Sequence, residues 1–155
     1  MSENTDFKVC IRNLSREKYD QKIDQEYVLK FFAFKNSREN YRKNIGSFLT
    51  EYMEKVADSQ LDKDNNEIFA YQEEEEIFKK TFAILNNALG ENAFARVNKN
   101  KKFVTSLSPN HFDAFTMGIQ KHLGLLEPED SSRLVTSSVP TDEGNDDEQI
   151  HFTCG

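Results

Sequence analysis

The sequence predicts an all-α fold, in which a compact helical domain over residues 1–124 precedes an acidic, disordered tail over residues 125–155. Apolar residues recur at helical spacing in four segments. Only three prolines and six glycines are present, too few for the frequent turns of an all-β design. A chain of 155 residues can bury a core without staples, and thirteen phenylalanines with no tryptophan must fill most of that core.

The first 22 residues give only a weak signal. Phe7, Val9 and Ile11 alternate as in a short strand, and the same segment fits a peptide that docks on another surface.

The central element is a helix expected over residues 24–35. Its residues 27–34 are apolar on most of the helix circumference, so several neighbouring elements must cover it. Asp24 suits the N-cap position, with Ile23 and Val28 as a hydrophobic staple around it.

A second helix, over residues 44–57, is expected to pack on the first. Its apolar residues fall at i, i+3, i+4, i+7, i+8 and i+11, which places them on one stripe. These residues are Ile45, Phe48, Leu49, Tyr52, Met53 and Val56.

A third helix is expected over residues 67–89, ended by Gly90. Its inward stripe consists of Tyr71, Phe78, Phe82, Leu85 and Leu89. The acidic run of residues 73–76 is interpreted as a solvated face, because Glu75 and Glu76 precede Lys79 and Lys80 by four residues, a spacing that favours helical ion pairs.

Residues 91–107 are expected to be irregular or to form a short hairpin across Asn98, Lys99 and Asn100. This segment holds the one compact basic cluster of the sequence, and two interpretations stay open: a solvated loop tip, or a contact with a phosphate backbone. The candidate nucleic-acid-binding residues are Arg96, Lys99, Lys101 and Lys102.

The last helix is expected over residues 109–123. Ser108 suits its N-cap and Pro109 its first position. His111 and His122 are interpreted as surface residues, because no cysteine or second histidine lies at metal-ligand spacing from either.

The charge is distributed unevenly along the chain. Residues 124–155 carry −7, equal to the formal charge of the whole chain, whereas residues 91–123 carry +3. The apolar residues 150–155 that close the sequence predict either the end of the tail or the start of a further element, as in a fragment of a longer protein.

Motifs that carry catalytic or cofactor chemistry are absent from the sequence. There is no Gly-rich phosphate loop, His-Glu-x-x-His, Cys-x-x-Cys or Gly-x-Ser-x-Gly. Cys10 and Cys154 lie far apart, without a secretory leader, and are expected to be reduced thiols. No apolar run reaches the length of a membrane span. We therefore expect a cytoplasmic, non-membrane chain that is not an enzyme by itself and needs neither cofactor nor metal.

Three segments together resemble the helical half of the GmrSD-type, ParB-like nuclease family. The first is residues 26–34 with the aromatic and apolar positions that follow, the second is Leu89-Gly90-Glu91-Asn92-Ala93-Phe94, and the third is residues 110–115. The later positions of the first segment are Tyr41, Phe48, Leu49, Tyr52 and Met53.

This resemblance implies a helical region that follows a ParB-like catalytic domain in proteins that restrict foreign DNA. The family's Asp-Gly-Gln-Gln-Arg motif does not occur in the sequence, so no catalytic residue carries over. The implied role is a scaffold for a missing catalytic domain or partner protein, with at most a weak DNA contact. The alternative is an independent acidic interaction module without a nucleic-acid role, in which all phenylalanine-rich surfaces should be internal.

Overall fold

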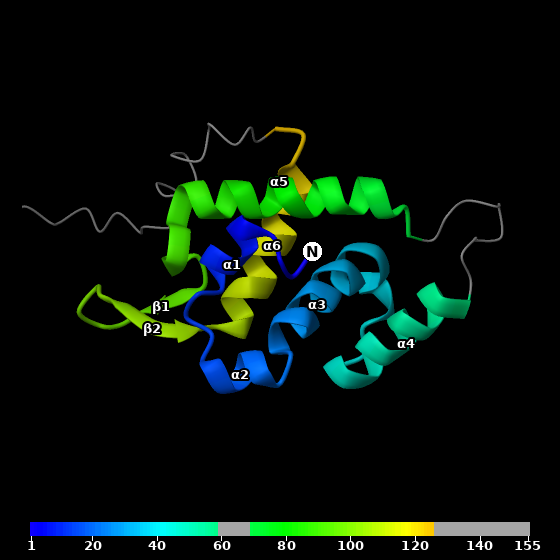
Figure 1. The fold of residues 1–155 in the computed structure, drawn as a ribbon, viewed down its shortest axis with the longest axis horizontal. Coiled ribbons are helices and arrows are strands. Elements are labelled where there is room, and N and C mark those ends of the chain that lie inside the picture. The colour runs from blue at the N-terminus through cyan, green and yellow to red at the C-terminus, as the bar shows by residue number, and fades with distance from the viewer. Residues whose placement is uncertain (59–68, 126–155) are drawn as a thin grey trace, which may run out of the picture.

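The computed structural model describes residues 1–58 and 69–125, which form a mostly helical fold with one β-hairpin (Figure 1). The α-helices of this part are α1 (Thr5–Cys10), α2 (Arg16–Asp20), α3 (Ile23–Ser37), α4 (Ile45–Asp58), α5 (Tyr71–Leu89) and α6 (Pro109–His122). The strands are β1 (Ala95–Val97) and β2 (Phe103–Leu107), and 3₁₀ turns occupy Arg38–Asn40 and Gly90–Asn92. The four expected helices are confirmed, but an all-α fold is wrong because of the hairpin. The expected acidic tail lies outside the described residues.

The first segment is helical, so its interpretation as a strand was wrong. The Asn4 side chain caps α1 by accepting a hydrogen bond from the Phe7 backbone N–H at 2.9 Å. Phe7, Cys10, Ile11 and Leu14 are all buried and stand at i, i+3, i+4 and i+7. This longer helical spacing, rather than the alternation of three residues, determines the local structure.

Helix α3 lies in the middle of the fold, as expected, with α2, α4 and α6 packed against it. Phe31 and Phe32 are only 1% and 4% exposed. Asp24 is not the N-cap. Lys22 takes that position at φ 62°, without a side-chain capping bond. Asp24 lies in the first turn of the helix, where its negative charge interacts favourably with the helix dipole.

Two aromatic or apolar positions expected to face inward are exposed. Met53 of α4 is 50% exposed, because α4 packs mainly on α3 at the edge of the fold and buries a narrower stripe, made by Phe48, Leu49 and Tyr52. Tyr71 is 58% exposed and is the first residue of α5, which begins four residues later than expected; residues 67 and 68 lie outside the described part.

Phenylalanine rings make the core, as the composition predicted. The ring of Phe82 lies 4.5 Å from that of Phe78 and 4.9 Å from that of Phe7, measured between centroids. Phe31 reaches the same cluster, with its ring 5.2 Å from that of Phe78. The core therefore joins α1, α3 and α5 through edge-on and tilted aromatic contacts.

The chain leaves α5 at Gly90, whose φ of 54° lies in the region that glycine tolerates best, and the hairpin and α6 follow. Pro109 is the first residue of α6, as expected, and Phe112 and Ile119 are buried. His122 is exposed, but His111 is half-buried because its ring turns toward the hairpin. None of the helices in residues 1–58 and 69–125 is long and apolar enough to cross a membrane.

Candidate nucleic-acid interface

The basic segment forms an antiparallel hairpin that projects from the helical body (Figure 1). Val97 pairs with Phe103 and Arg96 with Val104, and a register shift between Ala95 and Arg96 follows toward the helical body. Of the two structures expected for this segment, the hairpin is the one that forms. Residues paired across an antiparallel ladder share a face, and neighbours along a strand face opposite ways. Val97 and Phe103 therefore lie on one face, and Arg96 and Val104 on the other.

Asn98 organises the tip of the hairpin. Its backbone N–H donates to the Lys102 carbonyl at 2.9 Å, which extends the ladder, and its carbonyl accepts from the Lys101 N–H at 3.0 Å. Its side-chain oxygen accepts from the backbone N–H groups of Asn100 and Lys102 at 2.9 and 3.0 Å. Lys101 takes the left-handed conformation at φ 57°, as expected for a type I turn closed by a left-handed residue. The backbone of the tip is thus a defined turn that carries Lys99, Lys101 and Lys102.

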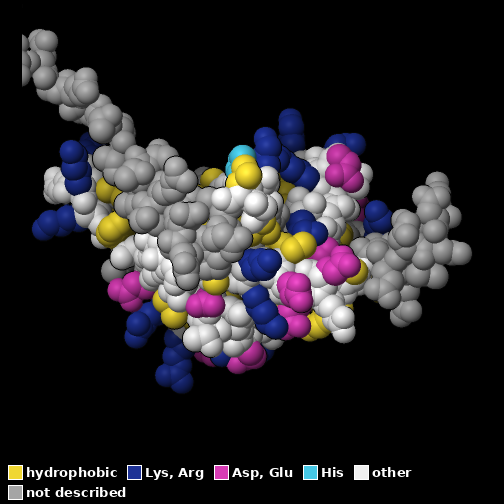
Figure 2. Space-filling model, turned by 90° about the horizontal axis from the view of Figure 1, so that it is seen from above, with side chains coloured by type: hydrophobic (Ala, Val, Ile, Leu, Met, Phe, Trp, Pro, Cys, Tyr) yellow, Lys and Arg dark blue, Asp and Glu magenta, His cyan; other side chains and the backbone are white. Residues whose placement is uncertain are grey.

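The four basic residues predicted from the sequence come together on this hairpin. Arg96 belongs to β1, whereas Lys99, Lys101 and Lys102 belong to the tip, and all four are exposed. None of them forms an ion pair with a carboxylate of the described residues. Figure 2 shows Lys and Arg side chains beside hydrophobic ones at the end of the molecule where Figure 1 places the hairpin. Within residues 1–58 and 69–125, therefore, no carboxylate neutralises these cations.

Exposed apolar side chains lie on the same hairpin as these cations. They were not predicted from the sequence. Val97 is 56% exposed, Phe103 53% and Val104 38%. Phe103 is the most exposed phenylalanine of the described residues. One signal was available: Phe103 directly follows two lysines and belongs to no helical stripe.

The base of the hairpin is fixed to the helical body. Phe94 is 1% exposed, and its ring lies 4.9 Å from that of Phe112 in α6. The Phe94 carbonyl accepts from the Ser108 backbone N–H at 2.8 Å. The Nδ1 atom of His111 lies 2.8 Å from the Ala95 carbonyl oxygen, so His111 is not the free surface residue that was expected. These contacts hold both ends of the hairpin against the start of α6.

A second polar cluster lies where α3, α4 and α5 meet, and Glu74 is its centre. Glu74 is only 7% exposed, so the interpretation of the whole run 73–76 as a solvated face was wrong at this position. Its Oε1 atom accepts from Lys35 Nζ at 2.9 Å and from Asn36 Nδ2 at 3.0 Å. Asn36 Nδ2 also lies 3.1 Å from the Tyr52 hydroxyl, to which it donates. The neighbouring Glu75 does pair with Lys79, at 3.0 Å, as expected.

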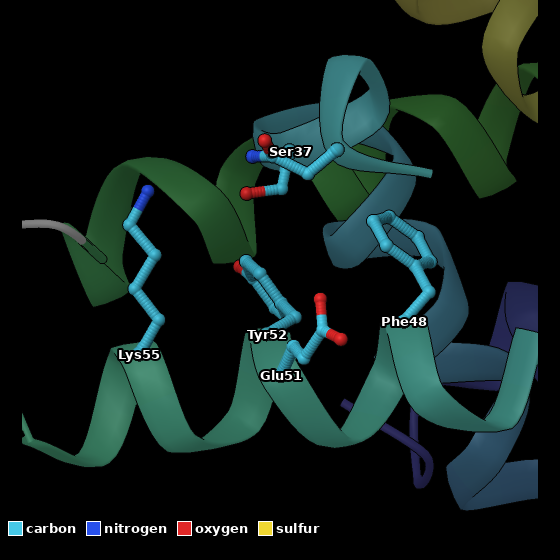
Figure 3. Close-up of a pocket in the computed structure, with 6 residues that line it drawn as sticks. Ser37, Phe48, Glu51, Tyr52 and Lys55 are labelled. Carbon is cyan, nitrogen blue, oxygen red and sulfur yellow. The ribbon is translucent and has the colours of Figure 1, made fainter. Parts of the chain in front are cut away.

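A pocket of about 210 Å³ adjoins this cluster. Figure 3 shows Glu51, Tyr52 and Lys55 of α4 lining it opposite Ser37 at the end of α3. Burial raises the pKa of Tyr52, and the hydrogen bond from Asn36 acts in the opposite direction. The pocket is smaller than typical sites for organic ligands, which measure about 300–1,000 Å³. Two of its lining side chains bond residues beside the pocket: the Tyr52 hydroxyl accepts from Asn36, and Asn40 donates to Glu39.

Nucleophilic and metal-binding groups give no competing site within the described residues. Cys10 is buried, and burial raises the pKa of its thiol to about 12, so it stays protonated at neutral pH. No group of three or more His, Cys, Asp or Glu residues in residues 1–58 and 69–125 is arranged to hold a metal ion. The exposed basic hairpin is therefore the candidate site.

Comparison of the chain with protein-family models, with curated protein sequences and with solved structures gives no significant match.

Proposed function

We propose that the chain is a non-catalytic helical region of a ParB-like DNA-restriction system, that it supports a separate catalytic domain, and that its basic hairpin contacts DNA. The link to such systems comes from the sequence resemblance. The observation that supports a DNA contact is the hairpin itself, where four exposed cations, three of them on a defined turn and Arg96 on β1, have no carboxylate partners in the described residues.

The contact is electrostatic and weak. Lysine and arginine bind DNA by neutralising phosphates and releasing counterions, which makes affinity depend on salt. Four neutralised phosphates give a log-log salt slope of at most about −3.6 on duplex DNA. Because the whole chain is acidic, with a formal charge of −7, repulsion from the remaining surface keeps the affinity low.

The alternative is an acidic interaction module without a nucleic-acid role. That alternative expects every phenylalanine-rich surface to be internal, and most phenylalanines are indeed in the core. The exposed Phe103, set among the cations of the hairpin, favours a binding role for this surface.

Binding of the purified chain to labelled duplex DNA, followed by fluorescence anisotropy over a range of KCl concentrations, tests the proposal. We expect weak binding with a slope no steeper than about −3.6. Changing Lys99, Lys101 and Lys102 together to Glu should abolish it. A charge-matched control that changes the exposed Lys18, Lys55 and Lys80 to Glu should weaken binding far less.

Two further measurements complete this test. Deleting residues 128–155, which removes most of the acidic tail, should tighten binding. The chain should not cleave DNA when Mg²⁺ or Mn²⁺ is added, because the catalytic domain is separate. Salt-insensitive binding, or equal losses in the hairpin and control variants, would refute the role of the hairpin. Metal-dependent cleavage by the pure chain would refute the non-catalytic assignment.

A further inference from the structure

We infer that the hairpin prefers single-stranded nucleic acid to duplex, with Phe103 as a platform on which an unpaired base stacks. This inference rests on the proposed DNA contact and names the form of nucleic acid that the same surface selects. It is carried by the exposure of an aromatic ring among cations, which phosphate binding alone does not require.

The geometry provides a platform and an anchor. Phe103 is 53% exposed, and its cross-strand partner Val97, 56% exposed, lies beside it on the same face of the ribbon. Lys102 precedes Phe103 directly and, by the alternation of a strand, starts from the opposite face, whereas Lys99 and Lys101 lie in the fixed turn at the end of the ribbon. A strand with one base stacked on Phe103 would run past the turn, so the phosphates that flank this base are the ones we assign to the tip lysines.

Base stacking on the Phe103 ring is possible for single-stranded nucleic acid and not for an intact duplex. Each base presents a flat π-face, and stacking on an aromatic side chain contributes about 1–3 kcal/mol per base in single-stranded complexes. In a duplex both faces of an internal base are already stacked, so Phe103 has nothing to contact without unstacking it. The tip lysines, in contrast, can contact the phosphates of either form. The ring therefore adds affinity for single strands alone.

A membrane surface is a less suitable partner for the same side chains. The tip, which would enter the bilayer first, consists of Asn98, Lys99, Asn100, Lys101 and Lys102, all of them polar and exposed. The apolar residues stand behind the tip and are divided between the two faces of the ribbon. Inserting them would carry lysine charges toward hydrocarbon, which is costly.

The first experiment compares oligo-dT with a blunt duplex of equal length by anisotropy at one salt concentration. The Phe103→Ala chain should bind oligo-dT roughly 5- to 160-fold more weakly than wild type, and duplex within about twofold. Phe103→Leu, which stays apolar but lacks the ring, should lose nearly as much. Tyr71→Ala, which removes a similarly exposed aromatic on α5, should change neither affinity.

The second experiment uses the absence of tryptophan from the sequence. Phe103→Trp places a single reporter at the platform, and Tyr71→Trp places one on α5. Oligo-dT should quench the emission at position 103 strongly and that at position 71 little, and duplex should quench neither. Vesicles that contain phosphatidylserine should leave the emission at position 103 unshifted.

The outcomes separate the two proposals. If duplex binding depends on the tip lysines but Phe103→Ala leaves the oligo-dT affinity unchanged, the platform is refuted and the electrostatic contact stands. Equal losses on oligo-dT and duplex also refute the platform. If neither nucleic acid binds, the proposed DNA contact fails, and the platform fails with it. A blue shift at position 103 with anionic vesicles, without quenching by oligo-dT, would identify a membrane contact instead.

Discussion

Removing the Glu74 carboxylate should destabilise the protein far more than removing its neighbour's. Glu74 accepts hydrogen bonds from Lys35 and Asn36 at 2.9 and 3.0 Å, and its side chain is 9% exposed. Glu74→Ala leaves both donors without this acceptor in a poorly solvated place. Hydrogen bonds that involve charged groups contribute about 1.5–3 kcal/mol, and the Lys35 side chain, at 23% exposure, regains part of its hydration. We expect a loss of about 2–3 kcal/mol.

The matched control is Glu73→Ala, one residue earlier. Glu73 lies in the same first turn of α5 and interacts similarly with the helix dipole, but it is exposed. Reversible urea unfolding, followed by far-ultraviolet circular dichroism, should give a loss of under about 1 kcal/mol for this control. Because Glu74 Oε2 has no hydrogen-bond partner among the described residues, Glu74→Gln should be tolerated better than Ala. Equal losses for Glu73→Ala and Glu74→Ala would refute the role of the buried network.

Two further predictions concern the core. Phe31→Ala should lower the free energy of unfolding by about 3–5 kcal/mol. The Phe31 side chain is only 1% exposed, so its removal leaves a cavity among Phe32, Phe78 and Phe82. A loss below about 1 kcal/mol in a reversible melt would contradict its central place. Burial raises the pKa of Tyr27 from 10.0 to about 12. As the pH rises, the unfolded chain therefore releases this proton before the folded protein does. The stability that Tyr27 contributes is complete below pH 10 and is lost between pH 10 and about 12. Tyr27→Phe should flatten the fall in unfolding free energy over this interval by up to about 1.4 kcal/mol per pH unit, and an unchanged slope in alkaline unfolding curves would contradict the assignment.

Helical periodicity predicted the main helices because each buries a stripe that repeats over several turns. The stripe Phe78, Phe82 and Leu85 of α5 is an example, and all three residues are buried. Where an element ends or lies at the edge, the same pattern overstated burial, as at Tyr71 and Met53. Periodicity indicates which side of a helix is apolar. The width of the buried stripe depends on how neighbouring elements pack, which the sequence alone does not predict.

The buried acid and the exposed ring could not be predicted for a related reason. Glu74 stands in a run of four glutamates, and only the approach of α3, with Lys35 and Asn36, distinguishes it from the other three. Phe103 belongs to a segment too short for a periodic signal, so its exposure follows from the register of the hairpin. Both features depend on contacts between elements, whereas the four basic residues were found because they lie close together in the sequence, between positions 96 and 102.

The way the hairpin is attached should lower the entropic cost of the proposed binding. Flexible loops pay a cost in conformational entropy when they bind, and a fixed turn avoids most of it. Phe94 anchors the hairpin in the core beside Phe112, and the Ser108 and His111 contacts tie its base to the start of α6. Asn98 fixes the opposite end. Because contacts fix both the base and the tip, the proposed binding should lose little conformational entropy, which helps it against the opposing net charge of −7.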